Sequence, residues 1–251
     1  MLIDTHCHLY KEYYKNINSL MNEIRKDGIA IVINNGCNFK TSCEVEKLST
    51  LYNYMYFTIG LHPEENMSEI DDVIELIKKN LNNKKFVGIG EIGLDYYWNK
   101  DKKEKQKEIF KLQLNIAEKY NLPIIIHSRE STGDMLDILK KYKLKGIIHC
   151  FNSSVEVARE YIKMGFKLGI NGVVTFKNCK LIEVIKEIGI ENIVLETDSP
   201  YLTPVPDRGK QNNPTYINNI CDFLCDNLGI NKKELEYITN KNVRDIFDIT
   251  I

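Results

Sequence analysis

With 251 residues, 27% charged side chains and a formal net charge of −1, the chain has the composition of an ordinary globular protein. This length suits one α/β barrel of about 250 residues as well as two smaller domains. The sequence contains no run of about 18 apolar residues, which excludes a membrane-spanning helix. The near-neutral charge disfavours a protein that coats duplex DNA, because such proteins usually carry a basic stripe.

The cysteines and the N-terminus point to a cytoplasmic protein. Seven cysteines in a chain of this length do not indicate a disulfide framework. The N-terminus reads Met1-Leu2-Ile3-Asp4, without the basic segment and apolar stretch of a signal peptide. We therefore expect free thiols in a reducing compartment.

Short apolar runs rich in Ile, Val and Phe recur along the chain with little polar alternation. Such runs are typical of strands buried on both faces of a parallel sheet. They predict strands over residues 2–5, 29–34, 55–59, 86–89, 123–127, 146–149, 166–169 and 193–196.

Amphipathic segments separate these runs. Their spacing predicts helices near residues 17–24, 73–77, 105–120, 154–164 and 181–188, with two more near 214–228 and 232–247. Pro214 suits the first turn of a helix. Eight strands that alternate with helices predict an α/β fold of the (β/α)₈ TIM-barrel type rather than a doubly wound sheet. We expect one domain over residues 1–251.

All five histidines follow the ends of predicted strands, which is where a barrel of this type carries its chemistry: His6, His8, His62, His127 and His149. Residues i and i+2 of an extended chain share a face, so His6 and His8 can reach one ion. Neutral imidazole is the commonest ligand for borderline metals. Taken singly, His127 and His149 would more often be core histidines bonded to carbonyls, but together the five predict one metal site.

Carboxylates follow two of the same strands. Glu91 lies just beyond the fourth run, and each of its oxygens can take one ion. Asp198, beyond the eighth run, can bind an ion and hold the attacking water of a metal-assisted hydrolase. We interpret Glu196 as a structural acid of the barrel. Asp95 is expected either to orient a ligand histidine or to hold its loop.

Three cations are candidates for substrate binding. Arg129 comes two residues after His127 and should point the same way, where a guanidinium suits phosphate or carboxylate; a surface salt bridge is the alternative. Arg208 and Lys210 flank Gly209 in the polar loop 203–213. They fit a phosphate clamp at the barrel mouth and a solvated loop equally well.

Together these residues resemble the TatD family of metal-dependent hydrolases, within the amidohydrolase-like barrel superfamily. The matching segments are IDTHCHL (3–9), GLHP (60–63), GIGEIGLDYY (88–97), HSR (127–129), HCF (149–151), ETDSPYL (196–202) and NVRDIF (242–247). The stretches PVP (204–206) and RGK (208–210) are similar to the bacterial branch of that family.

The resemblance implies two metal positions and a substrate. Its ligands are four histidines and two carboxylates: His6, His8 and Asp198 for one ion, His127 and His149 for the other, and Glu91 between them. His62 matches a position near the substrate rather than a ligand. The resemblance further implies magnesium-dependent hydrolysis of DNA, with 3′–5′ exonuclease trimming in some members.

The leading hypothesis is therefore a deoxyribonuclease that cleaves single strands or strand ends. Asp198 orients the water and accepts its proton, while Arg129, with Arg208 or Lys210, holds phosphate oxygens. The alternative is a hydrolase of a small amide, lactone or phosphoester; Glu91 in place of the carboxylated lysine of many related barrels favours the TatD-like branch. A non-catalytic nucleic-acid-binding factor would lack ligands or carry a basic stripe, and neither holds here.

The ligand set and the resemblance favour different metals. Four histidines with two carboxylates favour Zn²⁺, Mn²⁺ or Fe²⁺ over Mg²⁺, which prefers oxygen and water. The resemblance instead points to Mg²⁺. We expect two divalent ions, no obligate protein partner and a monomer.

Overall fold

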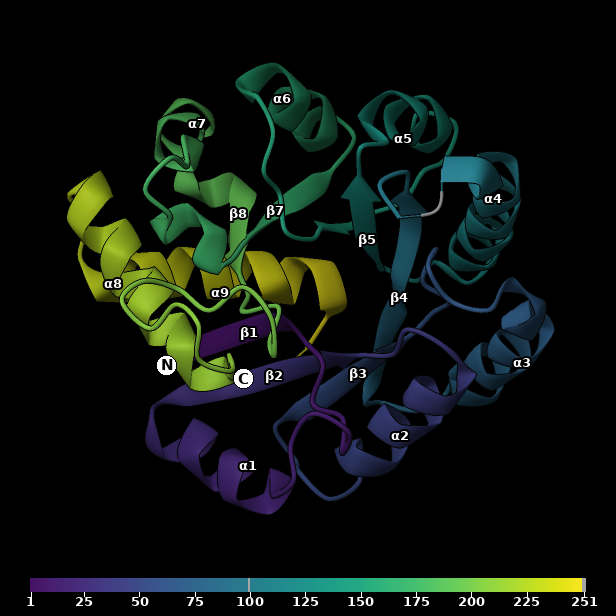
Figure 1. Cartoon of the computed structure of the whole chain (residues 1–251), viewed down its shortest axis with the longest axis horizontal. Helices are drawn as coiled ribbons and strands as arrows, with labels where there is room; N and C mark the ends of the chain where they lie inside the picture. The colour runs from purple at the N-terminus through teal and green to yellow at the C-terminus, as the bar shows by residue number, and fades with distance from the viewer. Residues whose placement is uncertain (99, 250–251) are drawn as a thin grey trace.

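The computed structural model describes residues 1–98 and 100–249 and contains one eight-stranded sheet whose strands follow one another in chain order (Figure 1). The strands are β1 (Leu2–Cys7), β2 (Ile29–Asn35), β3 (Met55–Ile59), β4 (Phe86–Asp95), β5 (Ile124–Arg129), β6 (Gly146–Ile148), β7 (Phe166–Ile170) and β8 (Ile193–Leu195). The predicted domain of residues 1–251 includes residues 99, 250 and 251, which lie outside the described residues.

The sheet curls into a nearly closed barrel, with a seam between β1 and β8. Every neighbouring pair from β1–β2 to β7–β8 is parallel. At the seam a parallel bridge joins Cys7 to Ser199. His8 N donates to Ser199 O at 2.8 Å, and Asp198 N donates to His6 O at 2.9 Å. The predicted (β/α)₈ barrel is confirmed, and its closure fixes three predicted site residues against one another.

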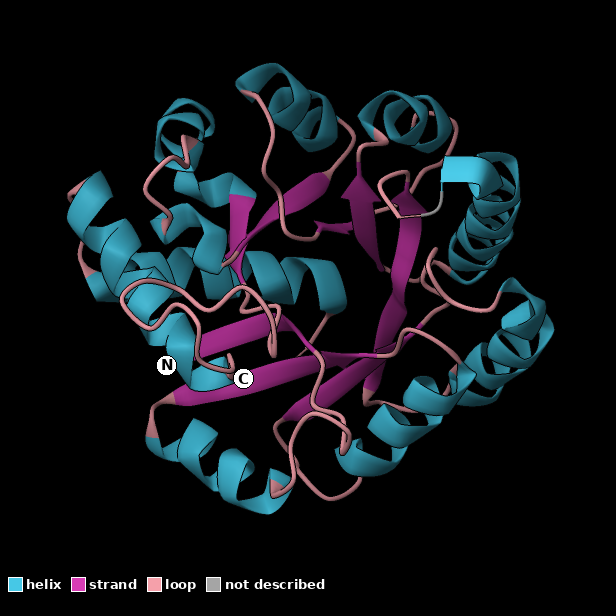
Figure 2. Ribbon diagram, viewed as in Figure 1, coloured by secondary structure: helices cyan, strands magenta, loops and turns pink. Residues whose placement is uncertain are grey.

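Helices surround the strands (Figure 2). The α-helices are α1 (Ile17–Lys26), α2 (Phe39–Ser49), α3 (Ile70–Asn80), α4 (Lys103–Tyr120), α5 (Thr132–Leu139), α6 (Val155–Lys163), α7 (Leu181–Ile188), α8 (Ile217–Leu228) and α9 (Lys232–Phe247). Short 3₁₀ helices are η1 (Met67–Glu69), η2 (Lys100–Lys102), η3 (Gly172–Thr175), η4 (Ile190–Asn192) and η5 (Pro214–Tyr216). Pro214 opens η5 as predicted. None of the described helices is long and apolar enough to cross a membrane.

Two apolar layers stabilise the barrel, because successive side chains of a buried strand point to opposite faces. In β5, Ile124 and Ile126 pack toward the surrounding helices, whereas Ile125 points inside. The inner layer is completed by Val243 and Phe247 of α9. Helix α9 crosses behind the barrel in Figure 1 and closes the amino-terminal end of the strands, leaving the carboxyl-terminal end open.

The structure corrects several strand ends near the site, among them that of β1, which continues to Cys7 beyond the predicted end at 5. Strand β4 continues to Asp95 and β5 to Arg129, beyond the predicted ends at 89 and 127. Gly93 explains how β4 lies so close to β5: its φ is +154°, and a Cβ there would overlap the carbonyl oxygen of His127. Only glycine fits both constraints. Conversely, β6 and β8 end one residue earlier than predicted, so His149 and Glu196 follow their strands.

Candidate metal centre

A cavity of about 880 Å³ opens at the carboxyl-terminal end of the barrel. Seven of the predicted site residues line it: His8, His62, Glu91, His127, Arg129, His149 and Asp198. His6, with no exposed surface, lies beneath them. The position agrees with the rule that barrels of this type carry their sites where the strands end.

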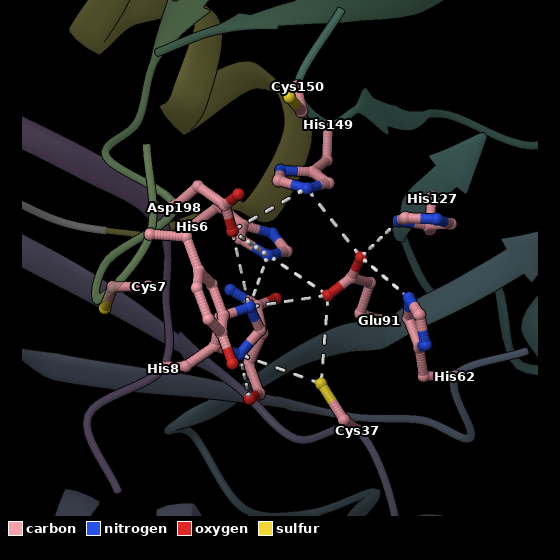
Figure 3. Close-up of polar contacts among 12 residues, drawn as sticks. His6, Cys7, His8, Cys37, His62, Glu91, His127, His149, Cys150 and Asp198 are labelled. Atoms are coloured by element: carbon pink, nitrogen blue, oxygen red, sulfur yellow. Dashed lines mark hydrogen bonds and ion pairs between the residues drawn. The ribbon is translucent and has the colours of Figure 1, made fainter. Parts of the chain in front are cut away.

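Glu91 occupies the middle of the site (Figure 3). Its Oε2 lies 3.2 Å from His6 Nε2 and 3.5 Å from His8 Nε2. Its Oε1 lies 3.0 Å from His127 Nδ1 and 3.7 Å from His149 Nε2. The two oxygens of one carboxylate therefore face two different histidine pairs, which is the arrangement a bridging ligand requires.

Asp198 completes the first of these groups. Its Oδ1 lies 3.8 Å from His6 Nε2 and 3.6 Å from His8 Nε2. The backbone at Asp198 is left-handed, with φ of 57°, and this turn after β8 brings the carboxylate over the cavity. Asp is among the residues that tolerate such a φ.

The donor atoms are spaced as metal ligands are. Those of His6, His8 and Asp198 lie within 4.8 Å of one another, as do those of Glu91, His127 and His149 (Figure 3). Ligands bound tetrahedrally at about 2.0–2.2 Å lie roughly 3.3–3.6 Å apart. The Nε2 atoms of His6 and His8 face each other at 3.0 Å beside Glu91, a group of acceptors that suits a shared cation. The residues fit divalent ions.

Two further carboxylates orient two of the candidate ligand histidines. Asp95 Oδ2 lies 3.0 Å from His127 Nε2, and its Oδ1 accepts from Trp98 N at 2.9 Å, so Asp95 both orients a histidine and holds its loop. Glu196 Oε1 lies 3.0 Å from His149 Nδ1. The interpretation of Glu196 as a purely structural acid was therefore too narrow. Such partners fix ring orientation and tautomer at metal sites.

The electrostatics of the centre suit a cation. Burial opposes ionisation of Glu91, but His62, His6 and His149 around it hold its pKa well below the usual range. The pKa of Asp198 is lowered in the same way, with burial opposed chiefly by His149. Two ionised carboxylates are thus held among buried imidazoles, and a bound divalent ion would offset their charge.

Burial lowers the pKa of His127 and His149, yet neighbouring carboxylates outweigh it. The bonds to Asp95 and Glu91 raise the pKa of His127 to about 9. The charge of Glu196, with those of Asp198 and Glu91, raises the pKa of His149 to about 9. Without metal these two rings are protonated at neutral pH, so metal binding releases protons.

Asp4 holds two segments of the site together, and the sequence did not single it out. Its Oδ1 accepts from His6 N at 3.1 Å and from Thr197 N at 3.0 Å, and its Oδ2 accepts from Thr197 Oγ1 at 2.6 Å. This fully buried carboxylate joins β1 to the segment after β8, the two segments that carry His6 and Asp198. An acid inside an apolar run is the signal that could have found it, because a buried carboxylate needs partners.

Cys37 was also missed. Its half-buried thiol lines the cavity, with Sγ 3.7 Å from His8 Nδ1 and 3.8 Å from Glu91 Oε2. Cys37 follows β2, and no motif around it pointed to the site. The one sign in the sequence was that Cys37 lies just beyond the end of a predicted strand.

The predicted substrate-binding residues fall into two groups. His62 and Arg129 line the cavity, and His62 Nε2 lies 3.4 Å from Glu91 Oε1. Arg208 instead lies over the Phe176 ring at 3.8 Å, and Lys210 pairs with Asp207. Arg208 and Lys210 are not among the described residues that line the cavity. The structure therefore places both cations outside the cavity, where they do not form the predicted clamp beside the donor atoms.

Comparison with known proteins settles the family. Residues 3–248 match the family model described as "TatD related DNase". The chain belongs to the TatD family. This TatD-family chain is 38% identical over 254 residues to the uncharacterized metal-dependent hydrolase YabD of Bacillus subtilis, covering 99% of this chain and 100% of that protein. It is 32% identical to an uncharacterized metal-dependent hydrolase of Methanocaldococcus jannaschii, over 98% of this chain and 96% of the relative.

Solved structures of TatD proteins agree. The TatD homologue YjjV of Escherichia coli superposes with a TM-score of 0.92 at 26% identity, covering 99% of this chain and 98% of that one. A TatD-family hydrolase of Entamoeba histolytica gives a TM-score of 0.85 at 25% identity, with the same coverage. The TatD-family chain is a metal-dependent hydrolase.

Proposed function

We propose that this hydrolase cleaves phosphodiester bonds of DNA, at single strands or strand ends, with two divalent ions. The observation that carries the proposal is the position of Glu91, whose two oxygens face separate histidine pairs. His6, His8 and Asp198 would hold one ion, His127 and His149 the other, with Glu91 between. When bound, such ions lower the pKa of a water molecule and offset charge on phosphate oxygens.

The chain's own residues supply the remaining steps. Asp198 lines the cavity, where its carboxylate can orient a water and accept its proton as the water attacks phosphorus and the P–O bond to the leaving nucleotide breaks. Arg129 lines the same cavity, where its guanidinium lies over the rings of Tyr97 and Trp98 and, among the described residues, makes no hydrogen bond or ion pair. Its N–H groups are therefore available to phosphate oxygens.

The donor set also bears on which metal is bound. Histidines at four of six proposed ligand positions favour Zn²⁺, Mn²⁺ or Fe²⁺ for tight binding. Mg²⁺, which prefers oxygen ligands and retains water, would bind more weakly. We propose that Mn²⁺ supports cleavage at lower concentration than Mg²⁺ does. Elemental analysis of freshly purified protein identifies the resident ions.

The direct test is cleavage of end-labelled single-stranded DNA by protein loaded with Mn²⁺ or Mg²⁺. We expect products that chelation abolishes and that His127→Ala reduces at least ~100-fold. A Lys210→Ala variant serves as the matched control, since the structure places Lys210 outside the cavity. Metal-loaded protein that leaves DNA intact would overturn the proposal.

One observation favours a small ester or lactone as a second candidate substrate. Outside the donor set, the cavity is lined by more acids than cations: Glu12, Glu64, Glu65 and Glu130 against Lys40 and Arg129. Such a lining repels a long polyanion and admits a small molecule more readily. Lactones, cyclic amides and small phosphoesters assayed beside DNA would separate the two candidates by kcat/KM.

A further inference from the structure

We propose that two aromatic clusters on opposite sides of the cavity mouth stack the bases of a single-stranded nucleotide end, with the scissile phosphate between them. The inference rests on the proposed phosphodiesterase function and narrows its substrate to short single-stranded ends. On this view the enzyme's affinity for the strand comes from base stacking rather than from contacts along a phosphate backbone.

The first group, here the tyrosine cluster, consists of Tyr10, Tyr13 and Tyr201. The Tyr13 and Tyr201 rings meet edge to face with centroids 5.9 Å apart, and Tyr201 Oη donates to Tyr13 Oη at 2.8 Å. Tyr10 stacks on Tyr13 at 5.6 Å. All three line the cavity, yet the Tyr201 side chain is 49% exposed. Its ring lies 6.3 Å from that of His8, so the cluster borders the metal centre.

The second group, here the tryptophan cluster, consists of Tyr97, Trp98 and Arg129. Trp98 is the chain's only tryptophan and is 60% exposed. It meets Tyr97 edge to face at 4.7 Å. The guanidinium of Arg129 lies 4.0 Å above the Tyr97 ring and 5.5 Å from that of Trp98. Arg129 and Trp98 line the cavity. Asp95 anchors the Trp98 backbone and also holds His127, which ties this cluster to the centre.

The order of the strands places the clusters across the barrel from each other. Tyr13 and Tyr201 follow β1 and β8, whereas Trp98 and Arg129 follow or end β4 and β5. With eight strands in chain order, the β4–β5 side of the barrel lies opposite the β8–β1 side. The donor atoms around Glu91 lie between them. A bond held at the centre therefore has an aromatic surface on each side.

The exposed aromatic rings and the acidic lining of the cavity mouth together favour one class of ligand. Large exposed apolar side chains that gather in one place mark binding surfaces. Every nucleobase has a flat face that stacks on such rings, and base stacking on protein aromatics tolerates any sequence. Few cations line the cavity, and Lys40 lies 3.8 Å from Glu12. Contacts along a phosphate backbone are therefore scarce, which favours a short end over a long strand.

The test measures kcat and KM of the metal-loaded enzyme on oligothymidylates of two to twelve nucleotides and on abasic strands of equal length. Trp98→Ala and Tyr201→Ala should each raise KM about 5- to 100-fold on oligothymidylates, because one stacked base contributes about 1–3 kcal/mol. They should change kcat less than about twofold and should not affect abasic strands. Trp98→Phe should restore most of the affinity.

The wild-type enzyme provides two further readouts. KM should stop falling once the strand is longer than about three nucleotides. The logarithm of KM should rise with log[salt] with a slope near 1, because each phosphate of a single strand that the protein neutralises contributes about 0.7 to that slope. Tyr237→Ala, which removes an exposed tyrosine of α9, is the matched control and should change nothing. Melting temperatures of all variants separate a folding defect from a binding defect.

The outcomes separate this inference from the proposed function. An enzyme that cleaves oligothymidylate and abasic strands equally well, and whose KM is indifferent to Trp98→Ala, would retain the phosphodiesterase function and overturn the stacking inference. An enzyme that cleaves neither would overturn both. A salt slope of 4 or more would also contradict the inference, because it would assign the affinity to the phosphate backbone.

Discussion

Single carboxylates fix the orientation of the candidate ligand histidines, and Asp95 is the clearest example. It contacts Nε2 of His127, the ring nitrogen that does not face Glu91, at 3.0 Å, and it also accepts a hydrogen bond from the backbone of Trp98. One carboxylate therefore holds both the ring of a candidate ligand and part of the cavity rim. Glu196 performs the first of these tasks for His149.

Asp95→Asn should weaken the enzyme without unfolding it. The amide keeps an oxygen for the backbone N–H groups of Tyr97 and Trp98 but loses the negative charge that faces His127. We expect a loss of about 10- to 100-fold in metal affinity or activity. Metal titration with an activity assay measures it. Asp134→Asn, whose carboxylate binds Tyr96 outside the centre, is the control; equal effects of the two changes would refute this role for Asp95.

At the scale of the elements, the close approach of β4 and β5 brings Glu91 beside His127. Gly93 permits that approach because its backbone has a positive φ and leaves no room for a Cβ against the His127 carbonyl. Across the barrel, the carboxylate of Asp4 joins β1 to the segment after β8. The two halves of the proposed ligand set thus depend on two separate strand contacts.

Gly93→Ala should lower the free energy of unfolding by more than about 2 kcal/mol, because both the φ and the carbonyl contact oppose a side chain. Gly133→Ala offers a matched comparison in α5, where a Cβ would meet nothing within 4 Å. That change should stabilise the protein by about 0.5–1 kcal/mol. Urea unfolding of both variants measures whether each change lowers or raises the free energy of unfolding. A Gly93→Ala variant with an unchanged free energy of unfolding would show that β4 and β5 can move apart freely.

In the molecule as a whole, the fold gathers buried carboxylates and imidazoles at one centre. A bound metal would change which of these groups carry protons. In metal-free protein the pKa of His127 and of His149 is about 9, against about 6.5 in an unfolded chain. A raised folded pKa means that the folded state binds more protons. Their stabilising contribution is therefore complete below pH 6.5 and is lost as pH rises to about 9.

The melting temperature of metal-free protein should consequently fall between pH 6.5 and 9. Protein saturated with Mn²⁺ should show the opposite trend or none, because the ion binds the neutral rings and competes with protons. Thermal scans at several pH values, with chelator or with metal, measure both profiles. Parallel falls in the two conditions would show that these histidines are not engaged by the ion.

The sequence predicted the barrel well because its strands are nearly pure apolar runs. The end of β4 was missed because Gly90, Glu91 and Gly93 interrupt the run there. Two helices were missed as well: α2 buries Thr41 and Ser42 in place of an apolar stripe, and α5 is only eight residues long. The predicted ligands were brought together because the barrel gathers its strand ends. Asp4, Cys37 and the aromatic clusters depend on contacts between distant segments, which periodicity does not encode.

A single titration tests whether the protein is a two-metal phosphodiesterase. Metal-free protein is titrated with Mn²⁺, and bound metal and cleavage of an end-labelled single strand are measured on the same samples. We expect two bound equivalents per chain, with cleavage that rises as the second site fills. Full activity at one equivalent, or an intact strand at two, would contradict it.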